Sequence, residues 1–154
     1  MTLSLKRWLR YVALLILVLF LCLQNSADSG ELTLAICNVV HSIARFFEQE
    51  LEIADYYFLV RKGGHFVAFT ILSMSGCLAV MCCARSLGVG MCISMALNLS
   101  IATFAEYAQS YAVGRVFTIR DTLINLLGAT LGIILGLVID AVRIARVAER
   151  ENPA

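Results

Sequence analysis

The sequence predicts an all-α membrane protein, a four-helix transmembrane bundle with an amphipathic helix in its first loop. Of the 154 residues, 60% are hydrophobic and 15% are charged. The mean hydropathy of +0.86 is too high for a soluble domain. No stretch alternates like a transmembrane β-barrel, so helices must satisfy the backbone hydrogen bonds inside the bilayer. At this length we expect a single domain over residues 1–154.

Four apolar stretches approach the ~20 residues that a helix needs to cross the hydrocarbon core. We expect these spans at about Trp8–Leu23, His65–Ala84, Leu87–Ala105 and Thr122–Val142. The first span follows Lys6 and Arg7, so a signal peptide is the competing interpretation. No small-x-small cleavage site follows it, which favours an uncleaved helix.

Basic residues predict the orientation of the chain. Residues 1–10 carry three basic residues and no acid, and three arginines follow the last span: Lys6, Arg7, Arg10, Arg143, Arg146 and Arg150. Because Lys and Arg concentrate on the cytoplasmic side, both termini are predicted to be cytoplasmic. The loop 24–64 and the turn 106–121 then share the outer face. That loop carries the acids Asp28, Glu31, Glu48, Glu50, Glu52 and Asp55.

The outer loop shows helical periodicity. From Leu32 onward, apolar residues recur at Ile36, Val39, Val40, Ile43, Phe46 and Phe47. Asp28 with Glu31 three residues later resembles an N-terminal capping box. An amphipathic helix lying at the outer interface is predicted, and a helix folded over the ends of the spans is the alternative.

Ionisable and polar residues gather where three of the spans meet the outer face. We call them the polar cluster: Arg61, Lys62, His65, Glu106, Gln109, Arg115, Asp121 and Asn125. Charge at bilayer depth costs free energy and commonly marks a functional site. Arg61 and His65, four residues apart at the expected entry of the second span, share a helix face. Pairing of Arg61 or Arg115 with Glu106 or Asp121 would reduce the cost.

The motifs around this cluster resemble those of VanZ-like membrane proteins. They are RK-x-x-HF-x-x-F-x-x-L from Arg61, E-x-x-Q from Glu106, Gly114-Arg115, and D-x-x-x-N-x-x-G from Asp121. The resemblance covers about residues 55–136, with Val113 where the family often has proline. It implies a multi-pass protein of the bacterial inner membrane and, from the family's founding member, an association with resistance to the glycopeptide teicoplanin.

Two interpretations of the polar cluster stay open. It is either an ion-pair clasp that fixes three helices, or a clasp that also binds an anionic envelope ligand, a lipid head group or a glycopeptide. The anion would be held by Arg61, Lys62 and Arg115, with Lys62 as the base expected to lack an internal partner. Glu106 and Asp121 would orient these bases, while Gln109 and Asn125 would supply hydrogen bonds.

Other functions receive less support from the sequence. An enzyme acting on a lipid-linked substrate would use His65 and Glu106 as its acid–base pair, yet no nucleophile motif is present. An accessory subunit would act through the stripe Gly128-x-x-x-Gly132-x-x-x-Gly136, which permits close helix packing, within the chain by default or between two copies. The six cysteines show no metal-ligand spacing. We therefore predict no metal, cofactor or nucleic-acid partner, and membrane lipid as the surroundings.

Overall fold

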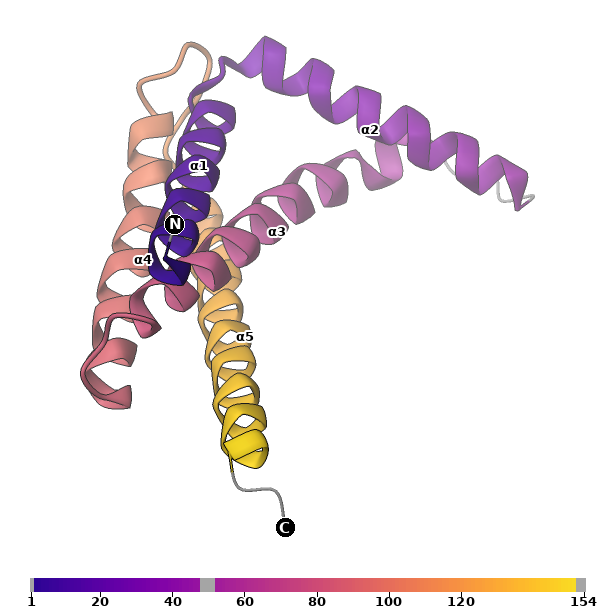
Figure 1. Cartoon of the computed structure of the whole chain (residues 1–154). Coiled ribbons are helices and arrows are strands. Elements are labelled where there is room, and N and C mark those ends of the chain that lie inside the picture. The colour runs from indigo at the N-terminus through magenta and orange to yellow at the C-terminus, as the bar shows by residue number, and fades with distance from the viewer. Residues whose placement is uncertain (1, 48–51, 152–154) are drawn as a thin grey trace.

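The chain is described by a computed structural model over residues 2–47 and 52–151, which contain five helices and no strand (Figure 1). The helices are α1 (Leu3–Leu23), α2 (Ser26–Phe46), α3 (Ile53–Met81), α4 (Leu87–Gln109) and α5 (Ile119–Glu151). The predicted all-helical membrane fold is confirmed. By length and composition α3, α4 and α5 can each cross a membrane, and α1 with α2, bent by 109°, qualifies as one further span. Of the loop acids, Glu48 and Glu50 lie outside the described residues.

The start of the second span is where the sequence prediction was wrong. Helix α3 begins at Ile53 rather than at His65, so the first motif lies inside a continuous helix. The apolar residues of 53–60 extend the helix upstream, and Gly63-Gly64 does not interrupt it. Tyr56 Oη donates to the Cys37 carbonyl at 3.1 Å and holds this extension against α2.

The N-terminal cap of α2 also lies earlier than expected. Asn25 is the N-cap, and its side chain accepts from the Asp28 backbone N–H at 2.8 Å while donating to the Asp28 carboxylate at 3.0 Å. The capping box therefore pairs Asn25 with Asp28, and the predicted pair of Asp28 with Glu31 is wrong. Helix α2 extends away from α1, α4 and α5 in Figure 1 and contacts the N-terminal part of α3, rather than folding over the helix ends.

Helix α3 occupies the centre of the fold. It contacts each of the other four helices, and its most extensive contact is with α5. Buried residues of α1, α3, α4 and α5 form the hydrophobic core, including Tyr11, Phe69, Ala102 and Ala129. Asn98 lies fully inside this core, where its side chain accepts from Tyr11 Oη at 3.3 Å and donates to the Ser94 carbonyl at 2.9 Å.

The glycine stripe of α5 faces α3. A Cβ atom at Gly128 would meet the carbonyl oxygen of Phe66, one at Gly132 that of Thr70, and one at Gly136 the side chain of Cys77. Both helices run in the same direction, and four-residue steps on one match four-residue steps on the other from Gly128 to Gly132. Such close backbone approach is what small residues permit in membrane helices.

Ionic contacts join the two termini at one end of the bundle. Arg7 near the start of α1 donates to the Leu78 carbonyl at 2.8 Å and lies 3.7 Å from Asp140 in the second half of α5. Only 9% of either charged side chain is exposed. At the opposite end, the Ser26 backbone N–H donates to the Val113 carbonyl at 3.1 Å, linking the α1–α2 and α4–α5 connections. The two termini therefore lie on the same side of the bundle.

Replacement of Gly132 by isoleucine is expected to destabilise the fold by about 1–3 kcal/mol or more, since the new side chain collides with the α3 backbone. Thermal unfolding of the purified protein in detergent measures the effect. Gly88→Ile is the matched control, because a Cβ atom at Gly88 meets nothing within 4 Å. Equal unfolding temperatures for the two variants would contradict the packing described for the stripe.

Candidate functional site

The candidate site lies at the end of the bundle where the α1–α2 connection meets the α4–α5 loop. The loop is fixed by the hydrogen bond from Ser26 to Val113 and by Gly114, whose φ of 75° favours glycine. A Cβ atom at Gly114 would lie 3.0 Å from Ser26 Cβ. Arg115 follows, and its backbone N–H donates to the Ala112 carbonyl at 3.1 Å. This turn sets the Arg115 side chain among the helix ends.

Thr118 immediately precedes α5 and connects it to α4. Its hydroxyl accepts from the Asp121 backbone N–H at 3.2 Å, and its own backbone N–H donates to Glu106 Oε1 at 3.4 Å. The first contact caps the helix, and the second fixes one oxygen of a buried carboxylate. Thr118-x-x-Asp121 has the spacing of a capping box, a signal in the sequence that would have revealed the role of Thr118.

Lys62 and Asp121 form the ion pair of the cluster. Lys62 Nζ lies 2.5 Å from Asp121 Oδ1, and 19% and 22% of the two side chains are exposed. The prediction that Lys62 lacks an internal partner is therefore wrong. Two cations approach the Phe58 ring: its centroid lies 5.6 Å from Lys62 Nζ and 4.8 Å from the Arg120 guanidinium carbon, distances typical of cation–π contacts.

Several buried polar atoms of the cluster have no hydrogen-bond partner among the described residues. They are Glu106 Oε2, Gln109 Nε2, Arg115 Nε and Nη2, and both side-chain amide atoms of Asn125. Glu106 is only 1% exposed and Asn125 is fully buried. Unpaired buried polar atoms cost free energy and are rare in native proteins. At this end of the bundle, therefore, the described residues do not satisfy the hydrogen-bonding capacity of the buried polar groups.

Neither Arg61 nor Arg115 pairs with an acid among the described residues, and the expected pairing with Glu106 or Asp121 is not formed. Burial, followed by the charge of nearby Arg61, lowers the pKa of Arg115 below its ordinary value, although Glu106 and Asp121 act in the opposite direction. The Arg115 guanidinium nevertheless remains charged, because arginine is not deprotonated in proteins. Two arginines near each other without a bonded acid produce a cationic site.

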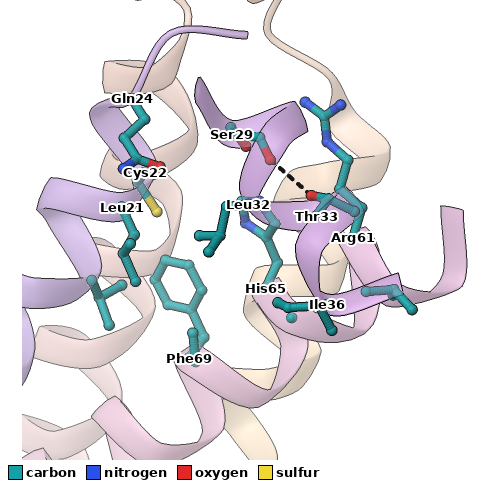
Figure 2. Close-up of a pocket in the computed structure, with 14 residues that line it drawn as sticks. Leu21, Cys22, Gln24, Ser29, Leu32, Thr33, Ile36, Arg61, His65 and Phe69 are labelled. Carbon is teal, nitrogen blue, oxygen red and sulfur yellow. Dashed lines mark hydrogen bonds between the residues drawn. The ribbon is translucent and has the colours of Figure 1, made fainter. Parts of the chain in front are cut away.

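A pocket of about 190 Å³ opens beside the cluster (Figure 2). Arg61 and His65 of α3, Gln24 after α1, and Leu32 of α2 are among its lining residues. Arg61 belongs both to this lining and to the pair of arginines that forms the cationic site. The pocket and the cationic site are therefore adjacent.

The structure brings most of the predicted residues together. Electrostatic contacts link His65 to Lys62, Arg61, Arg115 and Asp121. Gln109 is buried next to Cys22, and Asn125 is buried on α5 one turn after Asp121. His65 and Glu106, the proposed acid–base pair, share no hydrogen bond in the part of the chain that the structure describes. No local pattern in the sequence indicates a role for Cys22, Gln24 or Phe58, because their contacts with the pocket and the cluster depend on how the helices pack.

Comparison with protein families gives one match. The family model described as VanZ/LLP1 matches residues 8–140, which include α2, every residue of the polar cluster and the glycine stripe. No curated protein and no solved structure matches the chain.

The Lys62–Asp121 pair is expected to show a coupling energy of about 0.5–3 kcal/mol in a double-mutant cycle. Unfolding of Lys62→Ala, Asp121→Ala and the double variant, measured in detergent, gives this value. Lys6→Ala combined with Asp121→Ala serves as the control, because Lys6 lies at the other end of the bundle and its effect should add. Strict additivity for Lys62 and Asp121 would show that the contact contributes nothing.

Proposed function

The chain belongs to the VanZ/LLP1 family, and from this premise we propose that it binds an anionic ligand of the bacterial cell envelope at the polar cluster. Arg61 and Arg115 are the residues that hold the anion. Glu106, Gln109 and Asn125 orient the guanidinium groups or hydrogen-bond to the ligand. The ligand is a lipid head group or a glycopeptide, both of which carry anionic oxygen atoms.

The observation that carries this proposal is the pair of arginines without a bonded acid. The cluster contains three strong bases, Arg61, Lys62 and Arg115, and Lys62 already occupies Asp121. Two nitrogen atoms of Arg115 are buried without a hydrogen-bond partner among the described residues. A buried charge that lacks compensation is costly, and a guanidinium fork matches the paired oxygens of a phosphate or carboxylate. An anion at this position would satisfy both groups.

We propose that the cluster faces the outside of the inner membrane. Support comes from the basic residues at both termini and from the contact of Arg7 with Asp140, which places the termini on the side opposite the cluster. On that face the protein would meet lipid head groups and glycopeptides such as teicoplanin. Binding a lipid head group or a glycopeptide at the cluster would change how much antibiotic reaches its target, which connects anion binding with glycopeptide susceptibility.

Arg115→Gln is expected to weaken binding of dioleoyl-phosphatidylglycerol by about tenfold or more, since a hydrogen bond to a charged group contributes about 1.5–3 kcal/mol. Native mass spectrometry of the purified protein in detergent measures the binding. Arg61→Gln tests the second guanidinium, and Arg146→Gln, exposed at the opposite end of α5, is the matched control.

The same variants connect binding with susceptibility in cells. In a teicoplanin-susceptible bacterium, wild type and Arg146→Gln should shift the inhibitory concentration of teicoplanin, whereas Arg115→Gln should not, at equal membrane abundance. If Arg115→Gln and Arg61→Gln both bind phosphatidylglycerol as the control does, the anion-binding proposal is wrong.

Reporter fusions test the proposed orientation. Green fluorescent protein fused after residue 154 should fluoresce, because it matures in the cytoplasm. Alkaline phosphatase fused after residue 47 should be active, because it requires the outer side. Active phosphatase at the C-terminus would place the polar cluster on the cytoplasmic face instead.

A further inference from the structure

We propose that the ligand of the polar cluster is an anionic lipid, and that a hydrocarbon chain of this lipid lies in the pocket between α1, α2 and α3. The inference rests on the proposed function and specifies it, since it selects lipid over glycopeptide and assigns a place to the chain.

The pocket has a polar end and an apolar end. Figure 2 shows Gln24 and Arg61 toward one end and Phe69 toward the other, with Leu32 and His65 between them. Aliphatic side chains from three helices complete the walls, namely Val18, Leu21, Ile36, Val60 and Ala68. Arg61 is the permanent cation among the described lining residues, and none of them is acidic. This charge pattern complements an anionic head group attached to an apolar chain.

The size of the pocket favours a chain over a larger ligand. Pockets for drug-sized molecules usually enclose roughly 300–1,000 Å³, and this one encloses about 190 Å³. A glycopeptide antibiotic exceeds even that range. A section of one hydrocarbon chain, by contrast, is narrow enough to lie against Phe69.

The pocket also has a route from the bilayer. Three of its lining residues, Leu21, Leu32 and Ile36, are 36%, 46% and 47% exposed. These exposed apolar side chains form an apolar opening between α1 and α2, and this opening is the route by which a hydrocarbon chain would enter the pocket. The bend of 109° between these helices separates them and leaves the space open.

The polar end of the pocket connects directly to the cationic site. Arg61, one of the two guanidinium groups of the cationic site, itself lines the pocket. Arg115 lies near enough to Arg61 for their charges to repel. A head group at this end therefore meets the field of both guanidinium groups while its chain extends along α3.

Two adjacent glycines permit a clean test. Gly64 lines the pocket, and a Cβ atom there meets nothing within 4 Å, so a leucine side chain would fill the pocket without displacing the fold. A Cβ atom at Gly63 also meets nothing within 4 Å, but Gly63 does not line the pocket. Both substitutions replace glycine in the same turn of α3, so their effects on helix propensity are equal.

Dioleoyl-phosphatidylglycerol binding to the full chain in detergent should weaken by about tenfold or more in Gly64→Leu, because the leucine occupies space that the lipid chain would bury. Gly63→Leu should bind as wild type does. Dioleoyl-phosphatidylcholine should bind less tightly to wild type, and inorganic phosphate should not displace phosphatidylglycerol, because it has no chain. Ala68→Leu fills the same pocket and replaces Gly64→Leu if that variant does not fold.

Equal binding by the Gly64→Leu and Gly63→Leu variants would overturn the chain assignment. A remaining sensitivity to Arg115→Gln would then still support anion binding, so the two proposals fail separately. Equal affinity for phosphatidylcholine would overturn the choice of an anionic lipid. Displacement by inorganic phosphate would identify a free anion as the ligand and overturn the inference.

Discussion

The contact between α3 and α5 is the constraint on which the rest of the structure depends. Gly128 and Gly132 admit the backbone of α3 at positions four residues apart on both helices, so the two helices run parallel in a fixed register. Toward the N-terminal ends of both helices, Lys62 lies one turn before Phe66 on α3, and Asp121 lies about two turns before Gly128 on α5, and the two side chains meet as an ion pair. The close approach of the two helices at Gly128 and Gly132 therefore helps to position this ion pair. Helices α1 and α4 also pack against α3, α4 contacts α5 as well, and Glu106 of α4 is buried.

The sequence predicted the fold class, the helix in the first loop and the residues of the polar cluster, because apolar length and misplaced charge are local signals. It failed where the outcome depended on packing. Helix α3 starts at Ile53 because its upstream residues find a partner in Cys37 of α2, a contact no local pattern reveals. Lys62 was expected to be the unpaired base because it lies off the Arg61–His65 face, but that offset points it toward Asp121 on α5. Pocket residues such as Cys22 became recognisable only once α1 and α2 were seen to diverge.

The two ends of the bundle treat buried charge differently. At the end that holds the termini, Arg7 bonds to a carbonyl and lies near Asp140, and Asp140 also lies 3.9 Å from Arg143. At the end that holds the cluster, Glu106 and Arg115 keep polar atoms without partners among the described residues. At the end with the termini, contacts within the chain therefore compensate the buried charges. At the end with the polar cluster, a bound ligand would supply the charge and hydrogen bonds that the described residues leave unmatched.

The long separation in sequence between Lys62 and Asp121, 59 residues, has a consequence for how the chain is made. Helix α3 is synthesised well before α5. During that interval Lys62 has no counter-ion, and the face of α3 that later packs against the glycines of α5 is uncovered. Retention of α3 beside the membrane insertase until α5 arrives would avoid exposing that lysine to lipid. A chain that terminates before α5 lacks both Asp121 and the helix face that covers α3. Its α3 would therefore be accessible to membrane proteases that degrade unassembled helices.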